Sequence, residues 1–227
     1  MPHAPVILKP HEPVAERVLL PGDPGRALRL ATLLIDGPRM LNHHRGLWGY
    51  SGLATDGEPL TIQSTGLGGP SAAAVVAELV ALGARRLVRV GTAAGLGSTP
   101  LGSLVVADEA LAADGTSRAL GAADRVHADR DLSDALAAAC DAARGLVASA
   151  DIHDPVLATA WTEAGALACD LATAAVLAAA QRHGAAAAVV LAVTRAGGER
   201  LADDAVEPLE AQAGAAALAA LAARSAH

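Results

Sequence analysis

An arginine inside an apolar stretch is the residue of this sequence that most directly indicates chemistry. Arg89 interrupts the apolar run 86–91, just before a glycine-rich segment that continues to Gly97. A buried guanidinium needs a negatively charged partner, and its planar fork matches a carboxylate or a phosphate. Two interpretations are open: an ion pair with an acidic side chain, or a phosphate-binding arginine at the end of a strand.

Three other side chains could donate hydrogen bonds to an anion, but the sequence around each of them also allows a purely structural role. Arg26 follows a Pro-Gly-Asp-Pro turn, in the first turn of an expected helix, where its side chain can fold back toward the same strand end. Arg45 lies between two histidines and a glycine, and Thr92 follows the strand that contains Arg89. The structural alternatives are a solvated arginine for the first two and a turn-capping hydroxyl for Thr92.

Acidic residues in three other segments are also candidates. Asp170 stands among apolar neighbours, which is costly unless the carboxylate is hydrogen-bonded or functional. The segment 151–154 pairs carboxylates with His153 but precedes a proline, so it predicts a solvated turn. In the loop before the last expected helix, Arg200, Asp203 and Asp204 are further charged candidates, with no role that their spacing requires.

The pattern of apolar residues predicts the helices and strands that carry these candidates. Short apolar runs that end in glycine-rich turns predict strands, and apolar residues at helical spacing predict helices. The expected strands are 17–20, 60–65, 86–91, 104–107 and 188–193. The expected helices are 26–35, 70–82, 132–144, 172–183 and 205–223. Asp23 suits the N-cap of the first helix and Pro24 its first position.

Strands that alternate with helices predict an α/β fold. We expect residues 1–227 to form a single three-layer α/β/α domain with a mixed, largely parallel central sheet. Ligands gather beyond the carboxyl ends of the strands in such a sheet. Three expected strand exits are rich in glycine, at Gly22, 66–69 and 91–97, which lets backbone N–H groups approach an anion. None matches a dinucleotide or Walker fingerprint.

Composition excludes several classes of protein. The 227 residues are 52% hydrophobic and 18% charged, which is typical of a globular chain. A net charge of -7 and only 1% aromatic residues argue against a nucleic-acid partner. No apolar window reaches membrane-spanning length and no signal peptide is visible, so we expect no membrane association and a cytoplasmic location. Cys140 and Cys169 predict neither a disulfide framework nor a zinc site.

Four segments together resemble the nucleoside phosphorylase family, which includes uridine phosphorylase and the hexameric bacterial purine nucleoside phosphorylases. They are Pro-Gly-Asp-Pro-Gly-Arg (21–26), His-Arg-Gly (44–46), Ser-Thr-Gly-Leu-Gly-Gly-Pro-Ser (64–71) and Leu-Val-Arg-Val-Gly-Thr (87–92). The glycine-rich third segment looks more like uridine phosphorylase. The likeness runs from about residue 17 to 110, and more loosely to the end.

The resemblance implies roles for named residues. Phosphate would be bound by Gly22, Arg26, Arg89 and Thr92. Arg45 would reach into a neighbouring subunit's site, and His3 would touch the sugar of the nucleoside across the same interface. The resemblance therefore implies a homodimer or a hexamer built as a trimer of dimers, with shared active sites.

The family reaction is reversible phosphorolysis, in which phosphate attacks the anomeric carbon of a ribonucleoside or deoxyribonucleoside and releases the free base. It needs positioning and electrostatics rather than a covalent nucleophile. The resemblance implies no metal and no organic cofactor, with inorganic phosphate as co-substrate. Some relatives hold a monovalent cation between subunits, but the carboxylate for it falls at Ala54 here.

The second half departs from the family pattern. The Glu-Met-Glu run that grips the ribose aligns with Asp170-Leu171-Ala172, which leaves Asp170 and Leu171 as the nucleoside-binding candidates. The acid that serves the purine base aligns near Arg195, and the insert that reads uracil is replaced by a short connection. Three functions are open: an altered phosphorylase, a catalytically weak phosphate- or nucleotide-binding relative, and a nucleosidase. The retained arginines weigh against the nucleosidase.

Overall fold

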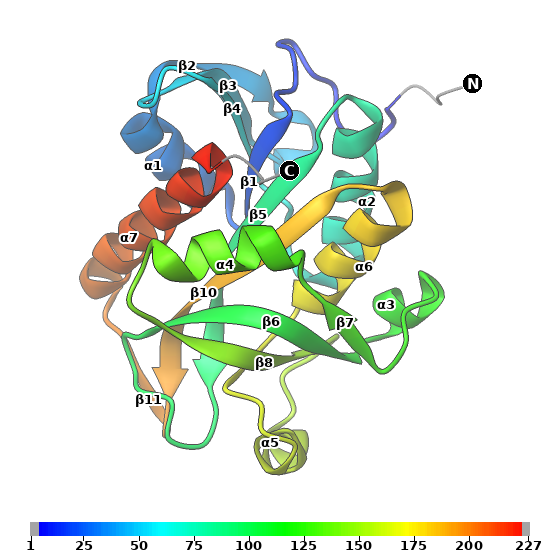
Figure 1. Ribbon diagram of the computed structural model, residues 1–227, viewed down its shortest axis with the longest axis vertical. Helices are drawn as coiled ribbons and strands as arrows, with labels where there is room; N and C mark the ends of the chain where they lie inside the picture. The colour runs from blue at the N-terminus through cyan, green and yellow to red at the C-terminus, as the bar shows by residue number, and fades with distance from the viewer. Residues whose placement is uncertain (1–4, 224–227) are drawn as a thin grey trace.

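The structure is a computed structural model that describes residues 5–223, and it is an α/β fold built on one mixed sheet (Figure 1). The strands are β1 (Arg17–Pro21), β2 (Ile35–Asn42), β3 (Gly49–Ala54), β4 (Pro59–Gln63), β5 (Arg86–Gly95), β6 (Leu104–Ala113), β7 (Arg125–His127), β8 (Ala142–Ala150), β9 (Ala168–Asp170), β10 (Ala186–Ala196) and β11 (Glu199–Arg200). The helices are α1 (Pro24–Leu34), α2 (Gly68–Ala81), α3 (Gly115–Ala119), α4 (Arg130–Ala138), α5 (Pro155–Glu163), α6 (Thr173–His183) and α7 (Asp203–Ala222), with a short 3-10 turn at His44–Gly46.

The centre of the sheet is parallel, as the alternation of strands and helices predicts. β1 pairs with β4 and with β5, and β5 pairs with β10, all in parallel register. The antiparallel hairpin β2–β3 extends this sheet beyond β4. On the other side the path β10-β6-β8-β9-β5 returns to β10, so these five strands close into a ring. The carboxyl ends of β1, β4, β5 and β10 therefore meet at one edge.

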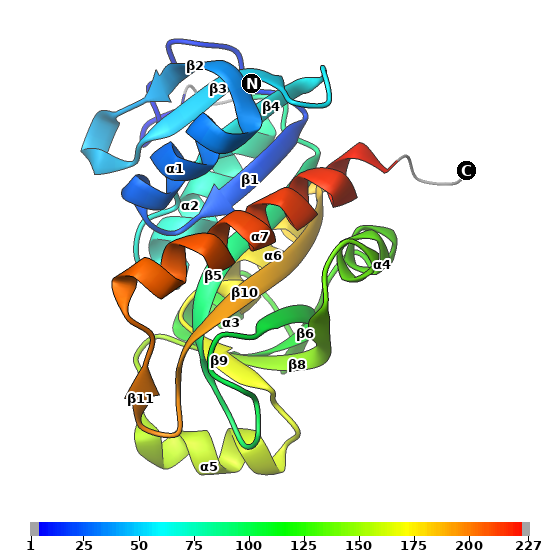
Figure 2. The same cartoon turned by 90° about the vertical axis from the view of Figure 1, so that its left-hand side faces the viewer.

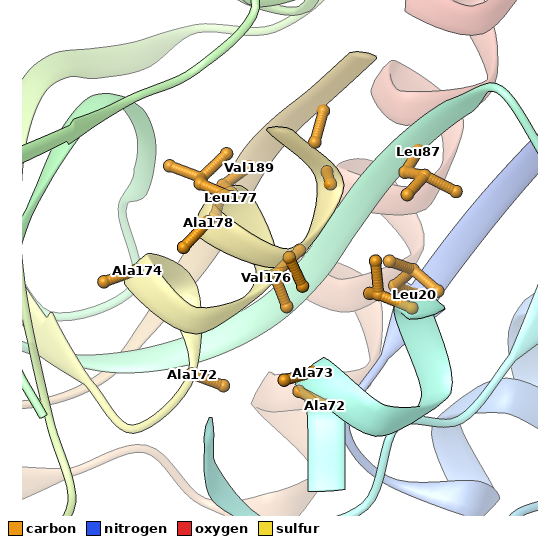
Figure 3. Close-up of a cluster of buried hydrophobic side chains, with 14 of the residues drawn as sticks. Leu20, Ala72, Ala73, Leu87, Ala172, Ala174, Val176, Leu177, Ala178 and Val189 are labelled. Carbon is orange, nitrogen blue, oxygen red and sulfur yellow. The ribbon is translucent and has the colours of Figure 1, made fainter. Parts of the chain in front are cut away.

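Helices cover both faces of the sheet (Figure 2). On one face α2 packs on α6 with α3 beside them, and on the other α7 contacts both α1 and α4. Figure 3 shows part of the first layer, where Ala72 and Ala73 of α2 and Val176 and Leu177 of α6 form one buried cluster with Leu20, Leu87 and Val189 of the sheet. With so few aromatic residues, close approach of alanine-rich helices supplies the packing.

One predicted helix is wrong in its second half. The expected helix 132–144 ends at Ala138, and residues from Ala142 onward form β8, which pairs in parallel with β6. Alanine favours a helix when nothing else decides, but pairing with a buried neighbouring strand overrides that preference. The hairpin strands β2 and β3 were not predicted, because polar and glycine residues interrupt their apolar alternation.

The start of α1 matches its prediction. Asp23 is the N-cap, its Oδ1 accepts a 2.7 Å hydrogen bond from the backbone N–H of Arg26, and Pro24 is the first helical residue. This cap satisfies a backbone donor that the first turn of a helix leaves free. It also holds the Arg26 backbone at the carboxyl end of β1. No helix within residues 5–223 is long and apolar enough to cross a bilayer.

Candidate active site at the carboxyl ends of the strands

A cavity of about 510 Å³ lies at the edge where the parallel strands end. It gathers site residues that are far apart in the sequence, with Gly22 and Arg26 following β1 and Arg89 and Thr92 lying in β5. The other predicted site residues in its lining are Asp170, Leu171 and Arg195. The rest of the lining is Asp23, Pro24, Gly66, Leu67, Gly68, Ala93, His153, Ala172 and Thr194.

Arg89 is held by a carboxylate and also reaches the cavity. Its Nε and Nη2 donate to Asp170 Oδ2 at 3.2 and 2.8 Å, and both side chains are buried. Its Nη1 is buried and has no hydrogen-bond partner among the described residues. This atom lies beside Gly22, where an added Cβ would come within 3.9 Å of it. The ion-pair interpretation is therefore right, and one donor nitrogen of the guanidinium remains unused.

Asp170 is a fully satisfied carboxylate. Besides the arginine, its oxygens accept hydrogen bonds from Ser149 Oγ at 3.1 Å and from Thr173 Oγ1 at 2.9 Å. The backbone N–H groups of Ala172 and Thr173 donate to Oδ1 at 3.2 and 3.0 Å. This set of donors offsets the desolvation of the buried charge. The carboxylate thus organises the start of α6 and fixes Arg89, while its contact with a nucleoside stays a prediction.

Arg26 also has an acidic partner, and it comes from the end of the chain. The Nε atom of Arg26 lies 2.6 Å from Oε1 of Glu210 on α7, at an angle too bent for a hydrogen bond. Nη1 of Arg26 donates weakly to the carbonyl of Val90 at 3.4 Å. No sequence pattern predicts that Glu210 is buried against Arg26, because its helical spacing resembles that of its solvated neighbours.

The carboxylates leave room between the two arginines. Arg26 and Arg89 line the same cavity, with Arg195 as a third guanidinium, against two aspartates in the same lining. The three arginines and two aspartates give the lining a formal charge of +1, whereas the whole chain has a net charge of -7. Local arginines in a concave site attract a small anion even when the whole protein repels polyanions.

His153 and Arg195, which both line the cavity, form a pair that was not predicted from the sequence. Nη2 of Arg195 lies 2.6 Å from Nε2 of His153. Partial desolvation, and next the charge of Arg195, lower the pKa of His153, so its ring is neutral at pH 7 and Nε2 accepts from the guanidinium. The segment 151–154 is largely exposed, as predicted, and Asp154 caps α5. Only the tertiary structure shows that His153 reaches the cavity.

A second, more apolar chamber of about 440 Å³ adjoins the first. His153 and Arg195 line both spaces, so this pair stands between them. Trp161, Leu96 and Cys169 contribute apolar walls to the second chamber. Burial raises the pKa of the Cys169 thiol, which keeps it protonated and unreactive.

The remaining predicted residues lie elsewhere. Arg45 is exposed in the turn after β2, with a φ of 58°, and it does not line the cavity. His3 lies outside the described residues. Arg200 borders the second chamber and forms an exposed ion pair of 2.8 Å with Asp203, whereas Asp204 is exposed in the first turn of α7. Within residues 5–223 no cluster of three metal-ligating side chains occurs, and the absence of a metal in the reaction stays a prediction.

The glycine-rich turn after β4 supports the cavity by close packing. Gly66 has a φ of 74°, and an added Cβ would lie 2.5 Å from Ser71 Oγ, which donates to the carbonyl of Thr65. We expect Gly66→Ala to cost about 1–2 kcal/mol for the left-handed backbone and about 1–3 kcal/mol more for crowding. Urea unfolding measures the loss.

Gly57 provides the matched control for this substitution. Its φ is 84°, but nothing lies within 4 Å of an added Cβ. Gly57→Ala should therefore show only the backbone cost of about 1–2 kcal/mol. Equal losses for the two variants would mean that the turn after β4 is not tightly packed.

The molecule is an α/β protein whose cavity, at the carboxyl ends of the parallel strands, suits a small anion. A family model described as the phosphorylase superfamily matches residues 16–225. This match covers most of the chain, and the chain belongs to that superfamily, the family of the nucleoside phosphorylases.

Curated relatives match over shorter stretches. The uridine phosphorylase of Treponema pallidum is 39% identical over 106 residues, which are 46% of this chain and 40% of that protein. The DeoD-type purine nucleoside phosphorylase of Exiguobacterium sp. is 43% identical over 84 residues, 37% of this chain and 35% of that protein. The uridine phosphorylase of Thermococcus kodakarensis is 39% identical over 106 residues, which are 46% of this chain and 38% of that protein. The matched stretches thus span 35–40% of the length of these relatives.

Proposed function

We propose that this chain is a nucleoside phosphorylase, which cleaves a ribonucleoside or deoxyribonucleoside with inorganic phosphate to give a sugar 1-phosphate and a free base. The observation that carries the proposal is the cavity shared by Arg26 and Arg89, in which Arg89 Nη1 has no partner among the described residues. An unused buried donor is costly until a ligand accepts from it. A phosphate dianion fits that need.

The proposed phosphate site uses groups from the ends of two parallel strands. Arg89 and Thr92 of β5 would donate to the phosphate oxygens, and the absence of a side chain at Gly22 lets the backbone after β1 approach closely. Arg26, at the N-terminus of α1, adds a second guanidinium, and the positive end of the helix dipole favours the anion there. Phosphate is thus the co-substrate, and the proposal includes no metal or organic cofactor.

The proposed chemistry is one displacement at the anomeric carbon. A phosphate oxygen forms the new bond to that carbon, the bond to the base nitrogen breaks, and its electron pair leaves with the base. Arg195 and the neutral His153 lie at the boundary with the apolar chamber, where the departing base would sit. Since a guanidinium only donates hydrogen bonds, it suits a base whose edge presents carbonyl oxygens and whose anion it stabilises.

The sugar site lacks one family feature. Leu171 and Ala172 supply no carboxylate to grip the ribose hydroxyls, so we expect ribonucleosides and 2′-deoxyribonucleosides to react at similar rates. Arg45 and His3 belong to the proposal only in an assembly, where they would complete a neighbouring subunit's site. We propose a homodimer or a trimer of dimers on that ground.

A panel of nucleosides tests the proposal. The protein is incubated with uridine, 2′-deoxyuridine, inosine and adenosine, with and without phosphate, and free base and sugar 1-phosphate are quantified. We expect base release that requires phosphate and is fastest for bases with carbonyl groups. Release without phosphate would indicate a nucleosidase instead. Phosphate-induced thermal stabilisation with no release would indicate a binding protein.

A further inference from the structure

Glu210 on α7 is a buried acid that lies outside the cavity lining but contacts an arginine within it. Its side chain is 4% exposed. One carboxylate oxygen lies 2.6 Å from Nε of Arg26, and the other accepts a 2.7 Å hydrogen bond from Nη2 of Arg29. Both contacts cross from α7 to α1. Burial of a carboxylate is costly, and here two guanidinium groups compensate it.

The packing around this pair is tight. Along α7, one turn beyond Glu210, an added Cβ at Gly214 would lie 2.3 Å from Leu30 Cδ2 of α1. The Arg29–Glu210 contact also favours the charged form of the arginine and raises the pKa of Arg29. Glu210 therefore projects from a helix whose position against α1 is closely determined.

Three contacts restrain Arg26. Asp23 accepts from its backbone N–H at 2.7 Å, Glu210 lies beside its Nε, and its Nη1 reaches the carbonyl of Val90. The Arg26 side chain lines the cavity at the strand ends, whereas Glu210 does not. An anion in the cavity would thus meet the guanidinium from one side while the carboxylate holds it from another. Pre-ordering a long arginine side chain lowers the entropy cost of binding.

We propose that Glu210 is a positioning residue that holds the Arg26 guanidinium in the orientation that binds phosphate. The proposal rests on the proposed function, because it takes phosphate as the anion in the cavity. The carboxylate acts on Arg26 through its charge and its place, because the contact at Nε is an ion pair and not a hydrogen bond. The last helix of the described chain thereby completes a site whose other residues lie at the strand ends.

Substitutions at Glu210 separate position from charge. Glu210→Gln keeps the length and an acceptor oxygen without the charge, and Glu210→Asp keeps the charge on a side chain that is one methylene shorter. Glu210→Ala removes both. The apparent Kd for inorganic phosphate is taken from the phosphate dependence of the melting temperature, and the KM for phosphate and nucleoside from initial rates.

We expect Glu210→Asp and Glu210→Ala to raise the Kd and KM for phosphate about tenfold to hundredfold, because a misdirected guanidinium forfeits most of its contact. The KM for nucleoside should stay within about twofold, since Glu210 is remote from the base chamber. Glu210→Gln should also weaken phosphate binding, because it removes the charge and its single amide oxygen can face only one of the two arginines. The control Glu207→Ala removes a 61% exposed acid whose Oε1 is 3.7 Å from Arg29 Nε, and it should change nothing.

Arg26→Ala distinguishes the failure of this inference from the failure of the proposed function. If Arg26→Ala weakens phosphate binding while Glu210→Asp and Glu210→Ala do not, the positioning role is wrong and the phosphate site stands. Tighter phosphate binding in Glu210→Gln would also overturn the inference, because the acid would then be a competitor of phosphate. If Arg26→Ala leaves phosphate binding intact, the phosphate site itself is misassigned.

Discussion

Arg89→Ala is expected to abolish the rise in melting temperature that phosphate produces in the parent protein. A ligand at a hundred times its Kd stabilises the folded state by about 2.7 kcal/mol, and the variant should lose this increment. The reason is geometric, because the free Nη1 beside Gly22 belongs to a guanidinium whose other nitrogens are anchored by Asp170. We also expect kcat to fall about hundredfold to thousandfold, as when a preorganised donor is removed.

Two further variants make the Arg89 experiment decisive. Arg125→Ala removes an exposed arginine whose surface pair with Glu109 contributes about 0–1 kcal/mol, and it should respond to phosphate as the parent does. Arg89→Lys keeps a charge without the fork, so it should fold and bind phosphate only weakly. If the melting temperature of Arg89→Ala still rises with phosphate as in the parent, Arg89 does not bind the anion.

Asp170→Ala should have the largest effect on stability of the single substitutions considered. It leaves Arg89, which is 6% exposed, without its carboxylate. Breaking a buried ion pair on one side costs about 3–5 kcal/mol. For a chain of this size that lowers the melting temperature by about 6–20 °C. The backbone donors at the start of α6 lose their acceptor as well.

Phosphate should partly rescue this variant. With the aspartate gone, a bound dianion becomes the main counter-charge of Arg89, so phosphate should raise the melting temperature of Asp170→Ala by more than it raises that of the parent. Asp114→Ala is the control: Asp114 is also buried, but it caps α3 through Ser117. It should cost about 0.5–2 kcal/mol with no change in the phosphate effect. If phosphate raises the melting temperature of Asp170→Ala by no more than it raises that of the parent, phosphate binds away from Arg89.

Much of the cavity was predictable because its residues carry local signals. A glycine-rich exit, an arginine inside an apolar strand and an aspartate-proline helix start each stand out within a few positions. Parallel pairing then brings the segments together without further information, as the register of Leu20 with Arg89 illustrates. The position of α1 follows in the same way from its cap at Asp23.

Other features carry no such local signal. The stretch 142–150 contains alanines, which favour a helix, and it forms a strand because its backbone pairs with β6. His153 lies in a polar segment typical of a solvated turn, yet the path of the chain before α5 brings it to Arg195. Glu210 looks like any acid on the last helix until α7 packs against α1.

The amino-acid sequence predicts the α/β class, the glycine-rich strand ends and the arginines that line the cavity. Each of these depends on interactions within a few residues or on the regular pairing of neighbouring strands. The folded structure is needed to show which carboxylates hold those arginines, that Nη1 of Arg89 has no partner among the described residues, and how the sheet closes through β10. These depend on contacts between segments more than 80 residues apart, such as Arg89 with Asp170 and Arg29 with Glu210. Such contacts are set by the packing of whole layers, which no local pattern encodes.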